Sequence, residues 1–135
     1  MKTLLLASLI CPNLGTFYKT CKVIQGQFSE SIDLSIVQRQ NTYHISSMDP
    51  ATQERTVDTY KADGKVYEQV LTDEDSGESL TYTTQTSCTP TELKIITTFS
   101  GDQLTVVMKK VGNKLEQRIS GQNLGQKVSA SILCE

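Results

Sequence analysis

The fold is decided by residues 92–108, which read ELKIITTFSGDQLTVVM. On both sides of Gly101-Asp102, every second position is apolar or Thr, and the positions between them are mostly polar. Alternation with period two is typical of a β-strand that turns one face inward and the other to water. The Gly-Asp pair is a turn signal. This stretch therefore predicts two neighbouring antiparallel strands joined by a short turn.

The same alternation recurs along the chain, and turn residues separate the runs. Asp63-Gly64 and Gly112-Asn113 are two-residue hairpin signals, and Thr89-Pro90 blocks a continuing ladder. Asp49–Glu54 predicts one helical turn at most, with an N-cap followed by Pro at the first helical position. Ten strands are predicted, over residues 14–24, 31–39, 42–48, 55–61, 65–72, 79–88, 92–99, 103–111, 114–120 and 126–134.

The regular spacing of these short strands predicts an up-and-down meander. Ten strands in a flat sheet would leave two edges open, and closure removes them. A barrel of ten strands is wider than one of eight, which can already hold a small ligand. We therefore predict an all-β, closed or nearly closed antiparallel barrel of about 8–10 strands with some interior space. A two-sheet β-sandwich is the alternative.

The first ten residues have the composition of an export signal. Lys2 is a short positive start, and residues 3–10 (TLLLASLI) form an apolar run. We expect a signal segment over 1–10, a single domain over 11–135, and a periplasmic or secreted protein. The alternative is that residues 3–10 form a first strand or a buried arm. No apolar run is long enough to predict a membrane-spanning helix.

The four cysteines are Cys11, Cys21, Cys88 and Cys134. An even number in a small exported domain indicates two disulfides, whereas a zinc site needs close pairs that this chain lacks. In the predicted barrel Cys21 lies on the first strand, beside the last, and the other three lie at one end. Because bridged Cα atoms must lie within about 7 Å, we favour Cys21–Cys134 with Cys11–Cys88. Cys11–Cys134 with Cys21–Cys88 is the alternative.

Candidate catalytic groups are few. His44 is the one histidine, and it lies on the polar face of a predicted strand with no nucleophile or orienting acid indicated beside it. Oxidised cysteines leave no thiolate nucleophile. We therefore expect no catalytic role, no metal and no cofactor.

Two charged clusters are assigned to the surface. Residues 73–78 (DEDSGE) do not match a calcium-binding loop because Gly77 comes one residue early. The formal net charge of -2 argues against a nucleic-acid partner. The second cluster, interpreted as a charged rim that deters strand-to-strand aggregation, contains Lys109, Lys110, Lys114 and Arg118.

The inward face of the predicted barrel mixes apolar and polar side chains. Thr86 and Gln117, for example, share faces with apolar residues. A mixed lining suits a hydrated cavity with a few orienting hydroxyls. The alternative is that the Thr hydroxyls bond to the backbone of a filled core. The predicted cavity lining consists of Phe17, Tyr82, Thr84, Ile95, Thr97, Phe99, Val106 and Met108.

Residues 11–18 (CPNLGTFY) resemble the start of lipocalin-like (calycin) barrels, in which G-x-W opens the first strand and its ring closes the barrel floor. Gly15-Thr16-Phe17 stands at that place, with Phe for Trp, and the other lipocalin motifs are not recognisable. The strand count is more similar to fatty-acid-binding proteins, but residues 25–31 leave no room for their helical lid. The opening C-P-N-L-G-x-x-Y-x-x-C and the closing L-C-E also resemble small exported bacterial proteins, a likeness that implies no activity.

Two functions are compatible with these patterns. The first is a monomeric binding protein that holds a small hydrophobic or amphipathic ligand inside its barrel. The second is an interaction or inhibitor protein of the cell envelope that acts through its hairpin loops and has no ligand cavity. A solid core with an exposed apolar patch would favour the second. An enzyme is a third interpretation, which no set of catalytic groups supports.

Overall fold

The computed structural model describes residues 11–28 and 33–135, and this part of the chain consists of β-strands without a helix. The predicted strands are present with small shifts at their ends, except that the first is divided in two. The predicted signal segment and the first two residues of the strand predicted over 31–39 lie outside the described residues. The strands are β1 (Phe17–Tyr18), β2 (Cys21–Gly26), β3 (Leu34–Arg39), β4 (Thr42–Met48), β5 (Arg55–Lys61), β6 (Val66–Thr72), β7 (Ser79–Cys88), β8 (Glu92–Phe99), β9 (Asp102–Val111), β10 (Lys114–Asn123) and β11 (Gln126–Cys134).

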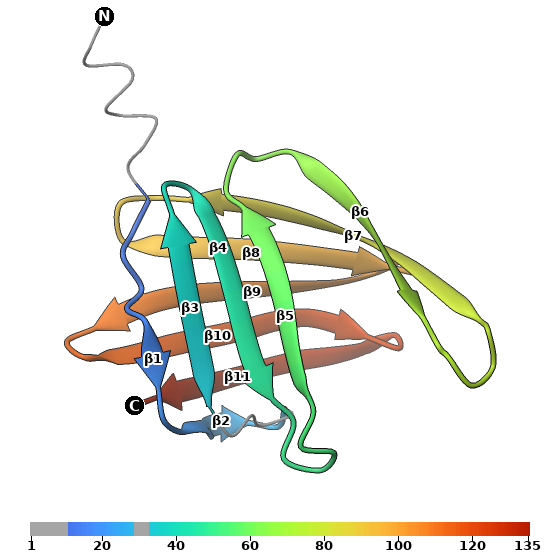
Figure 1. Cartoon of the computed structure of the whole chain (residues 1–135), viewed down its shortest axis with the longest axis horizontal. Coiled ribbons are helices and arrows are strands. Elements are labelled where there is room, and N and C mark those ends of the chain that lie inside the picture. The colour runs from blue at the N-terminus through green and yellow to red at the C-terminus, as the bar shows by residue number, and fades with distance from the viewer. Residues whose placement is uncertain (1–10, 29–32) are drawn as a thin grey trace, which may run out of the picture.

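The strands form two antiparallel sheets that face each other (Figure 1). One has the order β1-β3-β4-β5, and the other has the order β2-β11-β10-β9-β8-β7-β6. The chain passes between the sheets at Lys19 and Thr20, whose amides both donate to the carbonyl oxygen of Glu135, at 2.7 and 3.2 Å. The bend in the first strand and the end of the last strand therefore hold the two sheets together at one side.

The prediction of an all-β antiparallel meander is confirmed, but the sheets do not close into a barrel. β5 and β6 follow each other in sequence but do not pair with each other, and each is an edge strand of a different sheet. Gly64, in the turn between them, donates its amide to Thr86 O at 2.9 Å, and Gln85 Nε2 donates to Gly64 O at 2.8 Å. The turn predicted to make a hairpin is thus attached to β7, so β6 joins the larger sheet and β5 remains an edge.

The stretch predicted to form one helical turn, Asp49–Glu54, is a turn without a helix between β4 and β5. Gln53 donates its amide to Asp49 O at 2.8 Å, and Ala51 donates its amide to Asp49 Oδ1 at 2.8 Å. Asp49 thus caps a single turn, as its position before Pro50 suggested.

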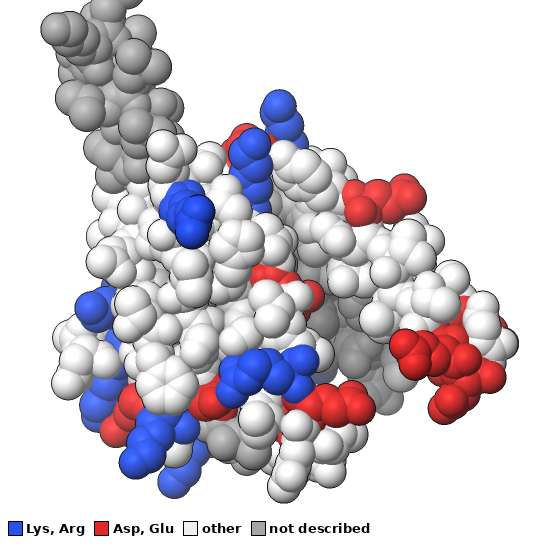
Figure 2. Space-filling view, in the orientation of Figure 1, with Lys and Arg blue, Asp and Glu red and all other residues white. Residues whose placement is uncertain are grey.

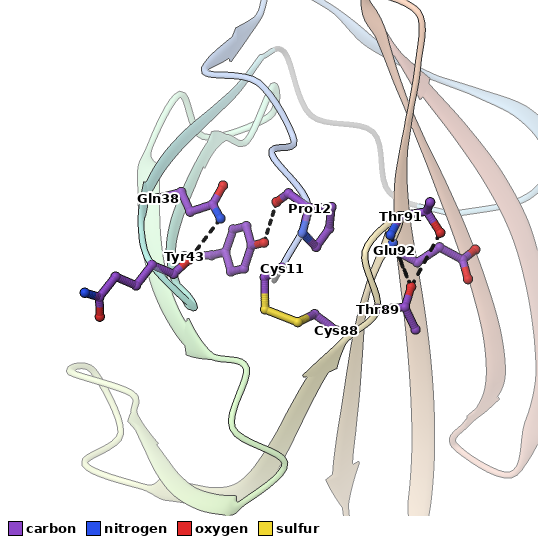
Figure 3. The surroundings of a disulfide bond; sticks show 9 residues. Cys11, Pro12, Gln38, Tyr43, Cys88, Thr89, Thr91 and Glu92 are labelled. Carbon is purple, nitrogen blue, oxygen red and sulfur yellow. Dashed lines mark hydrogen bonds between the residues drawn. A yellow bond between two sulfur atoms is a disulfide. The ribbon is translucent and has the colours of Figure 1, made fainter. Parts of the chain in front are cut away.

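Both disulfides are present, in the pairs favoured from the topology. Cys21–Cys134 joins β2 to β11, and Cys11–Cys88 attaches the segment before β1 to the end of β7. Figure 3 shows Tyr43 beside the second bridge, where its hydroxyl donates to Pro12 O at 2.6 Å. Burial raises the pKa of Tyr43 to about 12. Each bridge is expected to stabilise the fold by about 2–4 kcal/mol, mainly by restricting the unfolded chain.

The apolar side chains of the two inner faces meet in one core. Most of its residues come from β3 and β4 in one sheet and from β8, β9, β10 and β11 in the other, and Leu14, Tyr18 and Cys21 add to it from the first part of the chain. The fully buried members include Leu14, Ile36, Tyr43, Leu93, Leu115 and Cys134.

Gly26 ends β2 where its backbone lies against β11. It has a φ of +79°, and an added Cβ would lie 2.0 Å from the carbonyl oxygen of Ser129. Gly64 has nearly the same φ, +77°, with open space around it. We predict that Gly64→Ala lowers the free energy of unfolding by about 1–2 kcal/mol, because only the left-handed backbone is strained. Gly26→Ala should lower it by about 3 kcal/mol or more, because the backbone must also move.

Urea unfolding of the two variants separates these effects, since the φ values are matched. Equal losses of stability would show that β2 can move away from β11 without cost.

Candidate functional site

A cavity of about 360 Å³ lies between the two sheets. Its volume falls within the range of about 300–1,000 Å³ that is typical of sites for small molecules. Both sheets contribute to its walls, and most of the side chains are apolar. The lining residues are Phe28, Leu34, Ile45, Ser47, Met48, Asp49, Thr56, Asp58, Tyr60, Ile95, Thr97, Val106, Met108, Gln117, Ile119 and Ile132.

Strand register brings these side chains to the same face. Partners directly opposite each other in an antiparallel pair share a face of the sheet. In the smaller sheet Ile45 of β4 lies opposite Asp58 of β5. In the larger sheet Ile95 of β8 lies opposite Val106 of β9, which in turn lies opposite Ile119 of β10. The walls are therefore built by alternation along regular strands.

A second hollow, of about 440 Å³, adjoins the cavity at the edge strand β5. It shares Asp58, Tyr60 and Thr97 with the cavity and reaches across to the β6–β7 hairpin. In Figure 2 the surface is hollowed between β5 and this hairpin. The space between the sheets thus continues to the side where they do not pair. The hollow is lined by Val57, Asp58, Thr59, Tyr60, Gln69, Tyr82, Thr84 and Thr97.

Two titratable groups at this junction have shifted pKa values. Partial burial raises the pKa of Asp58 above its ordinary value. Asp58 is nevertheless exposed to solvent, because the hollow beside it admits water. The surrounding protein displaces only part of its hydration. Burial also raises the pKa of Tyr60, with smaller contributions from the charge of Asp58 and from Tyr82. Tyr60 is therefore protonated at neutral pH and can donate a hydrogen bond.

The charged side chains that line the two spaces are all acidic. Asp49 and Asp58 line the cavity, and no Lys, Arg or His from the described part of the chain lines either space. One carboxylate oxygen of Asp49 is used in the turn after β4. Neither a hydrogen bond nor an ion pair to Asp58 occurs among residues 11–28 and 33–135.

The structure brings most of the predicted cavity residues together. Ile95, Thr97, Val106 and Met108 line the cavity, and Tyr82 and Thr84 line the adjoining hollow with Thr97.

Phe17 and Phe99 line neither space. The side chain of Phe17 is 56% exposed, whereas Tyr18 beside it is 3% exposed and donates its hydroxyl to Leu14 O. The aromatic ring that turns inward at the start of the first strand is therefore that of Tyr18. Phe99 is half-buried at the end of β8.

Sequence reasoning missed the contribution of β5. Thr56, Asp58 and Tyr60 all line the cavity, although their strand carries no apolar alternation on that face. The one aliphatic residue of the strand, Val57, points to the other face and is mostly exposed. The available signal was the register, since a strand that follows β4 in a meander must place Asp58 opposite Ile45.

The other candidate residues form surface contacts. His44 lies beside Thr59, with 2.9 Å between its Nδ1 and the Thr59 Oγ1. In the basic cluster, Lys114 pairs with Glu135, and Arg118 pairs with Glu92 and Glu116.

The acidic residues 73–78 form the turn between β6 and β7, which is the red tip of the hairpin in Figure 2. No group of His, Cys, Asp or Glu side chains in the described ranges could hold a metal ion. In the same ranges no helix is long and apolar enough to cross a membrane.

Comparison with known proteins finds similarity in structure only. No protein-family model matches the sequence, and no curated protein matches it. Fatty-acid-binding protein 1 of Echinococcus granulosus superposes with a TM-score of 0.65 at 13% identity, over 89% of this chain and 94% of that one. A fatty-acid-binding protein from the brain of Drosophila melanogaster gives a TM-score of 0.59 at 13% identity, over 90% and 98% of the two chains.

A secretory abundant heat soluble protein of Ramazzottius varieornatus is also similar, with a TM-score of 0.58 at 13% identity, over 79% of this chain and 71% of that one. None of these three names describes an enzyme. At this level of identity the likeness concerns the fold alone. It supports the prediction of an all-β fold like that of fatty-acid-binding proteins.

Replacement of Asp58 tests its electrostatic environment. Because its pKa is raised in the folded state, the folded protein binds this proton more tightly than the unfolded chain does. The charged carboxylate therefore costs stability above the raised pKa, and the cost disappears as the pH falls below the ordinary value of 3.8. We predict that Asp58→Asn is more stable than the parent protein at pH 7 and equally stable well below pH 3.8.

Thermal unfolding at both pH values measures this difference. Asp75→Asn, in the exposed turn between β6 and β7, makes the same change of charge and should have little effect. An Asp58→Asn variant that is less stable at pH 7 would show instead that favourable contacts hold the carboxylate.

Proposed function

We propose that this protein binds one small apolar or amphipathic molecule between its two sheets, and that it does so outside the cytoplasm. The observation that carries the proposal is the cavity of about 360 Å³, whose walls are mostly apolar and include a few polar groups. Apolar walls provide affinity, and a small number of placed polar groups provide orientation. The fold similarity to proteins named for fatty-acid binding supports the same reading.

The disulfides support the proposed location. Structural disulfides persist in oxidising compartments and are rare in the cytosol. Both bridges here connect parts of the chain that are far apart in sequence, with separations of 77 and 113 residues. A periplasmic or secreted protein would keep them, and the predicted signal segment at residues 1–10 is in agreement.

A second candidate function is binding of an envelope protein through the β6–β7 hairpin. This hairpin extends beyond the other strands in Figure 1. It exposes an apolar pair, Leu71 and Leu80, directly opposite each other on its two strands, and Val66 and Val70 are exposed on the other face of β6. Exposed apolar patches mark interaction sites in many soluble proteins. This function would need no ligand in the cavity.

A cavity-filling substitution separates the two functions. Val106→Phe places a larger ring in the cavity wall on β9, and Val111→Phe makes the same change at the exposed end of that strand. We predict that decan-1-ol binds the parent protein at one site per chain, and that Val106→Phe weakens binding at least tenfold, or about 1.4 kcal/mol. Val111→Phe should leave the affinity unchanged.

Isothermal titration calorimetry gives both the affinity and the stoichiometry. Absence of binding by the parent protein would overturn the proposal and favour the hairpin function. Equal affinities for the parent and Val106→Phe would place the ligand elsewhere on the surface.

A further inference from the structure

The cavity has an apolar part and a polar part. Ile95, Val106 and Ile119 lie opposite one another on β8, β9 and β10 and form an aliphatic row on the larger sheet, with Gln117 and Ile132 beside it. The polar groups Asp58, Tyr60 and Thr97 lie where the cavity adjoins the hollow beside β5. A ligand that follows this division would bury an apolar portion between the sheets and place its polar group at the edge of β5.

The sign of the charge in this site is negative. Among the described residues, the two spaces are lined by two carboxylates and by no cationic side chain. Arg55, on the same strand as Asp58, does not line them, and its guanidinium is engaged elsewhere. It contacts Asp33 at 2.6 Å and Ser46 at 3.0 Å. An anionic head group would therefore meet like charge without a compensating partner.

Asp58 is placed to receive an opposite charge. Its carboxylate has no hydrogen bond or ion pair within the described part of the chain, and the residue is exposed on the edge strand β5. Tyr60 lines both spaces with it, and Tyr82 lines the hollow on the opposite side. Tyr rings attract cations through their π faces, and a carboxylate provides charge-assisted hydrogen bonds. Together these groups offer an ammonium ion both kinds of contact.

We propose that the ligand is an amphipathic amine, with its apolar body between the two sheets and its ammonium group bound by Asp58 beside Tyr60 and Tyr82. This inference rests on the proposed function and specifies the ligand class for the same site. The structural similarity to fatty-acid-binding proteins thus concerns the fold only. The negative charge of this interior favours a cationic head group over a carboxylate.

Three ligands with the same ten-carbon chain test the head group. Decylammonium, decan-1-ol and decanoate are titrated into the full chain at pH 7, below their micelle concentrations. We expect decylammonium to bind about tenfold more tightly than decan-1-ol, the usual effect of a hydrogen bond to a charged group. Decanoate should bind more weakly than decan-1-ol.

Asp58→Asn should remove the tenfold preference for decylammonium over decan-1-ol, which is measured as the ratio of the two affinities in the same variant. Asp75→Asn is the matched control, because it changes the net charge equally at an exposed turn and should keep the preference. Circular dichroism of both variants verifies that the fold is retained.

The outcomes distinguish this inference from the proposed function. If all three ligands bind equally, or if decanoate binds most tightly, the amine inference is wrong and the interior site stands. If none of them binds, both proposals are overturned. If Asp58→Asn still prefers decylammonium, the head group binds somewhere other than Asp58, and the inference is wrong.

Discussion

The two sheets are joined along one side and unjoined along the other, and the rest of the structure depends on this asymmetry. On the joined side, the first strand bends at Lys19 and Thr20, both of which bond to Glu135, and Cys21–Cys134 links the first strand to the last. On the other side, the turn at Gly64 is bonded to β7, and β5 and β6 do not pair with each other. The cavity lies between the inner faces, and the space continues past β5 into the adjoining hollow on the side where the sheets do not pair.

This arrangement explains why the space between the sheets can contain polar residues. Asp58 and Tyr60 stand on an edge strand beside a space that water can enter, so their hydration is reduced but not removed. The same residues in the closed side of the core would need protein partners for every polar atom. Tyr43 shows that requirement, because its hydroxyl is fully buried and bonded to Pro12. The unpaired edge thus supplies both access for a ligand and the polar groups that would orient it.

Alternation and turn residues were sufficient to predict the strands, their antiparallel order and most of the cavity wall on β8 and β9, since each of these depends on local pattern. Two features depended on tertiary contacts instead. Phe17 and Tyr18 are adjacent aromatic residues, and the inward one is set by the pairing of β1 with β3, which places Tyr18 opposite the buried Leu34. On β5 the aliphatic Val57 faces outward and Asp58 faces inward. Hydrophobicity alone would turn the face of Val57 inward, whereas the register with β4 turns the face of Asp58 inward. The alternation pattern alone therefore did not predict the polar residues that β5 contributes to the site.

The most direct test of an accessible interior is the methyl NMR spectrum of the protein during titration with decan-1-ol. Met48 and Met108 both line the cavity, from opposite sheets, and Val111 is exposed at the end of β9. A ligand between the sheets should shift the methyl signals of both methionines in a single saturable transition and leave the Val111 methyl signals in place. Methionine signals that do not move, under conditions where calorimetry detects binding, would contradict the account because the ligand would then lie outside the two sheets.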